Sequence, residues 1–216
     1  MLSFLETAGY IQKKLSDKPL PGIDAMLEMA PVSRRGYLHN FSDSAIVASV
    51  LFLVYPKNGK TFFPIIIRPT RNKLDKHRGQ LSMPGGKLEK SDASHWACAV
   101  RETEEELGIE ASGIEYLGEL TPLWIPISNF MVYPFVGKYA QEPVFKIQPE
   151  EVAGVLELDL HALLDEKSKK NGTISMHSGI ELQDVPFFDI EGHKIWGATA
   201  MMLNEIVTLL KSESLR

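Results

Sequence analysis

Long apolar runs along the chain predict that strands form much of the fold. The first two, 44–55 (SAIVASVLFLVY) and 61–68 (TFFPIIIR), are rich in β-branched and aromatic residues, and the turn sequence PKNGK separates them. Strands with so short a glycine-containing connection are typical of a β-hairpin. Further strands are expected at 114–120, 129–139 and 152–158.

Other segments carry apolar residues at helical spacing. In the segment 1–16, five apolar side chains fall on roughly one face: Leu2, Leu5, Tyr10, Ile11 and Leu15. Prolines at 19 and 21 end this pattern, a short helix is expected around 24–29, and a long one at 195–211. The segment 167–178 is polar, contains an Asn-Gly pair and has no period, so we expect a loop there. Strands interspersed with two major helices predict an α/β (α+β) fold with a mixed central sheet between helices.

One of these two major helices, expected over about 93–107, contains the most distinctive polar pattern, RETEEE at 101–106. At about 100° per residue, Glu102, Glu105 and Glu106 fall within a sector of roughly 100°. The side that a helix would bury carries Trp96, Val100, Thr103 and Leu107. The pattern predicts a helix over about 93–107, with Ser91 or Asp92 as its N-cap.

This cluster of carboxylates suggests a metal site. Like charges three and four residues apart oppose helix formation, and close carboxylates raise one another's pKa. A hard divalent cation such as Mg²⁺ or Mn²⁺ would relieve both effects, because it prefers carboxylate oxygen ligands. The alternative is a solvated acidic face, the usual meaning of a run of glutamates.

The spacing of several features favours the metal site. The segment from Gly79 to Ile109, GQLSMPGGKLEKSDASHWACAVRETEEELGI, resembles the signature of the Nudix hydrolases. The second half of that signature is R-E-hydrophobic-x-E-E-x-G-hydrophobic, and only Thr103 matches it weakly. The first half is shifted: Ala93 and Lys87 stand where the signature has glutamate and glycine, and the glycine pair lies one place further upstream.

That shift resembles the branch of the family that cleaves coenzyme A. The branch has an upstream pattern similar to R-S-x-x-L-R-x-H-x-G-Q-V-x-F-P-G-G, which this chain matches well from Leu74 onward. Two extra residues follow Arg68, Asp75 replaces an arginine and Met83 replaces a phenylalanine. The segment 193–211 resembles the closing helix of this branch, and the segment 150–164 resembles a strand-then-helix unit of Nudix proteins in general. The likeness therefore covers about residues 45–210.

The resemblance implies a Nudix-type α/β/α sandwich, a signature helix region at about 86–109 and a set of site residues. Metal ligands are expected at the backbone carbonyl of Gly86 and at Glu102, Glu105 and Glu106, which are also the expected catalytic residues together with Arg101. Arg101 is expected to orient a glutamate through a salt bridge. Either one of these carboxylates or a later acid, Glu150 or Glu151, is expected to be the general base.

Substrate binding is expected upstream of this helix. The basic, glycine-adjacent stretch before it supplies the candidates Arg68, Arg71, Lys73 and His77, followed by Gly85. Such a cluster would have a partner in the 3′-phosphate of coenzyme A, because arginine and lysine bind phosphate by charge-assisted hydrogen bonds. A solvated flexible loop is the alternative for this stretch. His95 and Trp124 are expected to be a surface histidine and a packing residue.

Composition narrows the class of protein. With 216 residues and 44% hydrophobic residues, the chain is expected to hold one catalytic domain, 41–216, preceded by an N-terminal helical extension, 1–40. A net charge of -5 argues against a nucleic-acid partner. No apolar run suits a membrane span, and the single cysteine suits a cytoplasmic protein. A homodimer is possible.

The expected activity is metal-dependent hydrolysis of a pyrophosphate bond in a nucleoside diphosphate derivative. Coenzyme A or acyl-coenzyme A, cleaved to 3′,5′-ADP and 4′-phosphopantetheine, is the favoured substrate that the resemblance implies. ADP-ribose or another nucleotide is the alternative. A non-catalytic nucleotide-sensing domain is the less favoured alternative, because such a protein should have lost signature carboxylates.

Overall fold

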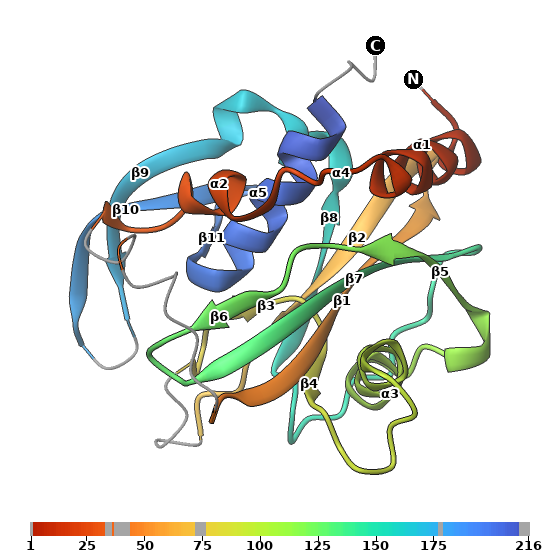
Figure 1. The fold of residues 1–216 in the computed structure, drawn as a ribbon, viewed down its shortest axis with the longest axis horizontal. Coiled ribbons are helices and arrows are strands. Elements are labelled where there is room, and N and C mark those ends of the chain that lie inside the picture. Colours follow the sequence, from red (N-terminus) through yellow and green to blue (C-terminus); the bar gives the residue numbers. More distant parts are fainter. Residues whose placement is uncertain (1, 33–35, 37–43, 72–76, 177–178, 212–216) are drawn as a thin grey trace.

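A mixed eight-stranded sheet forms the centre of the computed structural model, which describes residues 2–32, 36, 44–71, 77–176 and 179–211 (Figure 1). Its strands are β1 (Ile46–Lys57), β2 (Lys60–Ile67), β3 (Leu81–Ser82), β4 (Gly85–Lys87), β5 (Ile114–Glu119), β6 (Leu123–Ile125), β7 (Phe130–Tyr139) and β8 (Gly154–Asp159). The path β3-β2-β1-β7-β5 runs through it, while β4, β6 and β8 pair with β1, β7 and β2. Only the β1–β7 pair is parallel among the described pairs.

The predicted hairpin is confirmed. Strands β1 and β2 pair antiparallel, with Lys57 opposite Lys60. Both residues of the turn between them have positive φ, 49° at Asn58 and 74° at Gly59. This Asn-Gly turn matches the twist of the two strands, which is why it favours a tight hairpin.

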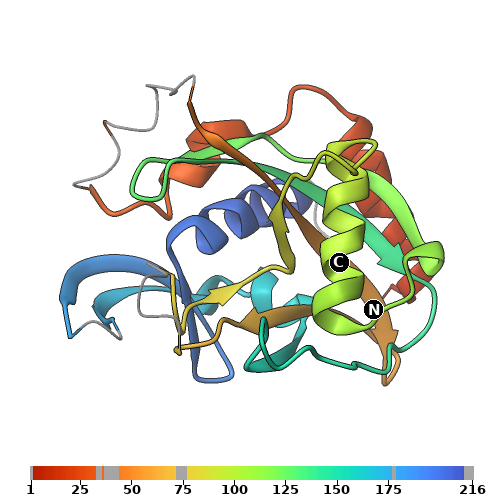
Figure 2. The ribbon, with the colours of Figure 1, turned by 90° about the horizontal axis from the view of Figure 1, so that it is seen from below.

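Helices cover both faces of the sheet, which gives the expected α/β/α sandwich (Figures 1 and 2). The helices are α1 (Phe4–Ser16), α2 (Gly22–Leu27), α3 (His95–Leu107), α4 (Leu160–Leu164) and α5 (Gly197–Lys211). Side chains of β1 alternate between two hydrophobic cores: Phe52 and Val54 pack with residues of α1, α2 and α5, and Leu51 and Leu53 pack with residues of α3. Because β1 is buried on both faces, its sequence is one nearly continuous apolar run.

The expected helix at 1–16 is present, and its buried face includes Ile11 and Leu15. Leu5 was assigned to that face wrongly, since it is 67% exposed. At about 100° per residue, Leu5 lies roughly 120° around the helix axis from Ile11, so it points to solvent. Because α1 and α2 contribute to the same core as α5, the N-terminal segment is packed against the rest of the fold.

The expectation of a loop at 167–178 was wrong. Residues Lys169–Ser175 form β9, which pairs with β10 (Glu181–Ile190), and β11 (His193–Trp196) completes a second sheet. Strand β9 lies at the edge of that sheet and buries only Ile174, so its sequence lacks the apolar alternation of a half-buried strand. Residues 177 and 178 lie outside the described part of the chain.

The last helix, α5, is buried almost all round. It begins at Gly197 instead of 195, because Ile195 and Trp196 belong to β11. Eleven of its residues are buried, including Asn204 and Glu205. A helix without a polar face must be enclosed by other elements, and α5 lies among α2, the small sheet and the central sheet (Figure 1). Within the described residues, none of the helices combines the length and apolar character that a membrane span requires.

Candidate active site

Helix α3 carries the predicted carboxylates. Its N-cap is Ser94, whose hydroxyl oxygen accepts a hydrogen bond from the N–H of Ala97 at 3.1 Å, so the expected caps Ser91 and Asp92 were wrong. It ends at Gly108, which has φ of 68° and donates its N–H to the Glu104 carbonyl. A left-handed glycine is a common helix terminus. Ala99 and Leu107 pack against the sheet, which fixes the acidic face towards β4.

Strand β4 brings the glycine pair against this face. Gly85 has φ of 147°, and a Cβ there would collide with the backbone of Ser49 and Val50 on β1. At Gly86 a Cβ would collide with the carboxylate of Glu102. The N–H of Gly85 donates to Glu106 Oε2 at 2.9 Å. Both positions therefore need glycine so that backbone and carboxylates approach closely.

Arg101 is an ion-paired centre beside the carboxylates, as predicted. Its guanidinium donates to both oxygens of Asp92, from Nε at 2.8 Å and from Nη2 at 3.0 Å. Nη1 reaches Glu102 at 3.1 Å and Glu105 at 2.9 Å. These contacts hold the pKa of Asp92 down to about 2. The guanidinium is thus positioned to orient Glu102 while its other end is held by Asp92.

The three predicted carboxylates differ in exposure. The Glu105 side chain is 48% exposed and the Glu102 side chain 14%, whereas residue Glu106 is 4% exposed. The sequence suggested one exposed acidic face, and for Glu106 that was wrong because β4 covers it. Burial raises the pKa of Glu106 to about 8, against the hydrogen bond from Gly85, and burial also raises the pKa of Glu102.

A cavity of about 710 Å³, here called the catalytic cavity, opens in front of these groups. It brings together six of the predicted site residues: Arg68, Arg71, Gly85, Gly86, Glu102 and Glu106. The candidate later acids Glu150 and Glu151 also line it, and so do Lys87 and Glu89, which sequence reasoning did not assign to the site. The sequence feature that could have identified Lys87 and Glu89 is that both lie within three residues after the glycine pair.

Other predicted site residues lie outside the lining of this cavity. His77 lines an adjoining cavity of about 480 Å³, the middle cavity, which also includes Arg68. Arg101 pairs with Glu102, which lines the cavity, and Glu105 pairs with Arg101. Lys73 lies outside the described residues.

Two other residues of α3, His95 and Cys98, pack against their neighbours in the fold. The His95 ring stacks on that of Tyr133, with 4.0 Å between the ring centroids, so it is not simply a surface histidine. Cys98 is fully buried, and this burial raises its thiol pKa to about 11, so it stays a thiol at neutral pH. Neither lines the catalytic cavity.

The residues present fit a divalent metal whose ligands are shared with substrate. Among the described residues, no three His, Cys, Asp or Glu side chains lie close enough to hold an ion by themselves. Mg²⁺ is usually bound by one or two carboxylates together with waters and substrate phosphates. Glu102 and Glu106 supply two carboxylates whose burial disfavours their charged forms, and a cation beside them would offset that cost.

The charge pattern of the catalytic cavity suits a phosphate-rich substrate. Arg68, Arg71 and Lys87 line it together with the carboxylates of Glu102, Glu106, Glu150 and Glu151. Cations neutralise phosphate oxygens, while carboxylates hold metal ions and accept a proton from water. The arrangement can therefore hold a pyrophosphate between basic groups and a metal.

Comparisons with known proteins agree with this geometry. The family model described as the NUDIX domain matches residues 46–177. A protein of Yersinia enterocolitica named uncharacterized Nudix hydrolase NudL is 36% identical over 151 residues, covering 66% of this chain and 76% of that protein. A NudL protein of Yersinia pestis is 34% identical over 172 residues, covering 76% of this chain and 85% of its own length.

Solved structures of this family are similar at a lower level. A MutT/nudix family protein from Enterococcus faecalis has a TM-score of 0.48 and 15% identity, covering 98% of this chain and 74% of its own. The MutT protein from Methanosarcina mazei has a TM-score of 0.47 and 16% identity, covering 78% of this chain and 96% of its own. Likeness at this level says nothing about the substrate.

Proposed function

The chain belongs to the Nudix family, and from that premise we propose that it hydrolyses the pyrophosphate bond of coenzyme A or acyl-coenzyme A with Mg²⁺ or Mn²⁺. The observation that carries the chemistry is the catalytic cavity, in which Glu102 and Glu106 face basic side chains next to the glycine pair. The choice of coenzyme A is supported by the one-residue shift of the signature and by the Gly79–Gly86 sequence.

The reaction adds water across a phosphoric anhydride. The oxygen of water forms a bond to one phosphorus, the bond from that phosphorus to the bridging oxygen breaks, and two phosphate monoesters result. The attacking water must lose a proton, and the bridging oxygen leaves with negative charge. A divalent metal would supply charge neutralisation and lower the pKa of water at this site.

The chain's own residues divide this work. Glu102 and Glu106, with the Gly86 carbonyl, are the proposed metal ligands, and waters and substrate phosphates would complete the set. Glu105, which was expected to be a further ligand, pairs with Arg101 outside the cavity lining. Glu150 and Glu151, which also line the catalytic cavity, are the candidates for the general base. Arg68 and Arg71 bind phosphate oxygens by charge-assisted hydrogen bonds, and Arg101 positions Glu102.

The 3′-phosphate gives coenzyme A a further anionic group to bind. Arg68 lines both the catalytic and the middle cavity, and His77 lines the middle one. Arg68 therefore lies beside both the space proposed for the pyrophosphate and the adjoining middle cavity, where the rest of the substrate would bind.

Product analysis tests the proposal. The full chain is incubated with Mg²⁺ or Mn²⁺ and, separately, coenzyme A, ADP-ribose, NADH and diadenosine tetraphosphate, and products are identified by chromatography and mass spectrometry. We expect 3′,5′-ADP and 4′-phosphopantetheine from coenzyme A at the highest kcat/KM. A higher kcat/KM for ADP-ribose or a dinucleotide would refute the substrate, and no turnover of any compound would refute the enzymatic role.

A further inference from the structure

The catalytic cavity is the first of three that follow one another. It shares Arg68, Gly85, Gly86 and Lys87 with the middle cavity. The middle cavity in turn shares Ile125, Ile127, Gly197 and Ala198 with a third one of about 360 Å³. The shared lining residues place the three cavities in a row from the carboxylates of α3 to the start of α5.

The chemistry of the walls changes along this path. The catalytic cavity is mostly charged, and the middle one mixes polar residues with Phe130, Trp196 and Met202. Two hydroxyls of the middle cavity, those of Ser82 and Ser128, are buried without a hydrogen-bond partner among the described residues. A buried hydroxyl without a partner is unfavourable, so an amide-containing ligand in this space would supply what they lack.

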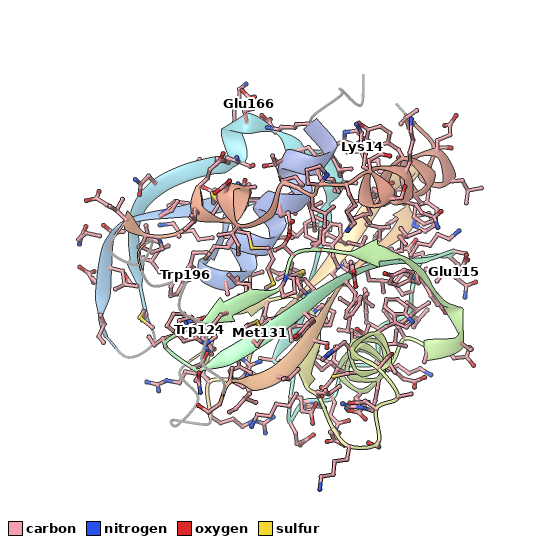
Figure 3. The ribbon with its side chains drawn as sticks, viewed as in Figure 1. Lys14, Glu115, Trp124, Met131, Glu166 and Trp196 are labelled. Atoms are coloured by element: carbon pink, nitrogen blue, oxygen red, sulfur yellow. The ribbon has the colours of Figure 1, made fainter. Side chains whose placement is uncertain are left out.

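The third cavity, here called the apolar cavity, has walls of aliphatic, proline and aromatic residues, including Leu123, Trp124 and Met201. Its one side-chain donor, the indole N–H of Trp124, is already bonded to Asn129 Oδ1 at 3.3 Å. An adenine ring has several polar nitrogens, and its burial here would leave them without side-chain partners. An aliphatic chain has no such requirement. Figure 3 shows Trp124 and Trp196 on one side of the molecule, away from α3.

We propose that the apolar cavity binds the acyl chain of an acyl-coenzyme A, so that short- to medium-chain acyl derivatives are preferred over free coenzyme A. This inference rests on the proposed function. The order of the cavities matches the order of groups in such a substrate: pyrophosphate at the carboxylates, the two amides of the pantetheine arm in the middle cavity, and the acyl chain at the end.

The size of the apolar cavity sets the expected range. A volume of about 360 Å³ has room for about a dozen groups of the size of a water molecule, so it accommodates acyl chains of up to about twelve carbons, including hexanoyl and octanoyl. Each methylene that is fully buried raises kcat/KM by about fourfold. We therefore expect kcat/KM to rise from acetyl- through butanoyl- to hexanoyl-coenzyme A and to level off once the cavity is filled.

The test measures kcat/KM of the full-length protein for coenzyme A and this acyl series, with Mg²⁺ and with product identification. A rise of about tenfold or more from acetyl- to hexanoyl-coenzyme A is expected. Equal values for coenzyme A and all acyl derivatives would overturn the inference and leave the proposed function in place. Values that fall as the chain lengthens would also overturn it, and absence of any coenzyme A hydrolysis would remove it together with the proposed function.

Two variants locate the effect. Ile127→Ser removes an apolar wall shared by the middle and apolar cavities, and Ile127 is 45% exposed, so the fold should tolerate the change. Ala198→Phe instead fills the junction. For both variants, the ratio of kcat/KM for hexanoyl-coenzyme A to kcat/KM for acetyl-coenzyme A should fall towards one.

The matched control is Ile147→Ser. Ile147 is 37% exposed and lines none of the three cavities, so its ratio should equal that of the wild type. If Ile127→Ser and Ala198→Phe both keep the wild-type ratio, the chain does not lie in the apolar cavity and the inference fails.

Discussion

Single residues of α3 differ in function although they share one acidic run. Glu106 is buried against β4, and Glu104 in the same run is exposed and accepts the N–H of Ala111. The four glutamates of this run therefore include two that line the catalytic cavity, Glu102 and Glu106, and one, Glu104, that caps the next turn. A sequence reading can place both on the helix but cannot know that β4 covers only one of them.

Replacement of Glu106 by glutamine should separate catalysis from folding. We expect Glu106→Gln to lower kcat by about 100-fold or more and to keep the fold, because glutamine can still accept the Gly85 N–H and carries no buried charge. Mg²⁺ should raise the Tm of the wild type and not that of the variant. Glu104→Gln is the control with wild-type turnover. Near wild-type turnover of Glu106→Gln would contradict its place at the site.

Asp92 should make stability depend on acid pH. Its pKa is lowered to about 2 by its hydrogen bonds with Arg101, below its usual value of 3.8. A group with a lowered pKa in the folded state stabilises the protein above its unfolded pKa, and this contribution is lost as pH falls through the folded value. Asp92→Asn should therefore cost about 2 kcal/mol at pH 7.

That difference should shrink between pH 4 and pH 2, as the wild-type carboxyl takes up its proton. Urea unfolding of both proteins at several pH values measures it, with Asp184→Asn, an exposed position, as the control. A difference that stays constant down to pH 2 would show that the Arg101 pair does not act through the charge of Asp92.

At the scale of elements, the contact of β4 with α3 sets the geometry of the site. Gly86→Ala should push the Glu102 carboxylate away, since the new Cβ would occupy its place. We expect kcat/KM to fall by about 100-fold with Tm little changed. Gly172→Ala, in strand β9, is the control because its Cβ would meet only Phe187 at an ordinary 3.5 Å. Full activity of Gly86→Ala would mean that Glu102 can move without loss.

The elements also show what sequence patterns can and cannot give. The hairpin, the glutamate helix and the strands near 114–120 and 129–139 were predicted, because buried alternation and turn residues lie within a few positions of one another. Strand β9 was missed because its partner β10 stabilises it through backbone hydrogen bonds, and these leave little trace in a local pattern. The cavity lining could not be predicted for a similar reason. Glu150 and Arg68 are far apart in the sequence, and folding brings them to one cavity.

The whole molecule is held together through α5. The buried Glu205 carboxylate accepts hydrogen bonds from the N–H of Gly22 and from the N–H and hydroxyl of Thr121. It thus joins the N-terminal segment and the loop after β5 to one helix. Asn204 adds a bond to the Ala25 carbonyl at 2.6 Å.

Loss of this junction should destabilise the entire fold. Glu205→Ala leaves two backbone N–H groups without their acceptor and should lower the free energy of unfolding by about 3 kcal/mol, measured by chemical denaturation. Glu166→Ala is the control, since that side chain is 90% exposed. An unfolding free energy equal to that of the wild type would show that water or another group replaces the carboxylate.

The placement of the cavities has a consequence for how such a protein can change in evolution. The carboxylates and glycines of the catalytic cavity lie within residues 46–177, which the family model matches, while Trp196, Gly197 and Ala198, on the walls of the other two cavities, lie beyond it. Part of the lining of these two cavities is therefore encoded after the stretch that carries the proposed metal ligands. From the proposed placement of the acyl chain, we expect mutations near the start of α5 to alter which compound is accepted and to leave the proposed metal ligands unchanged.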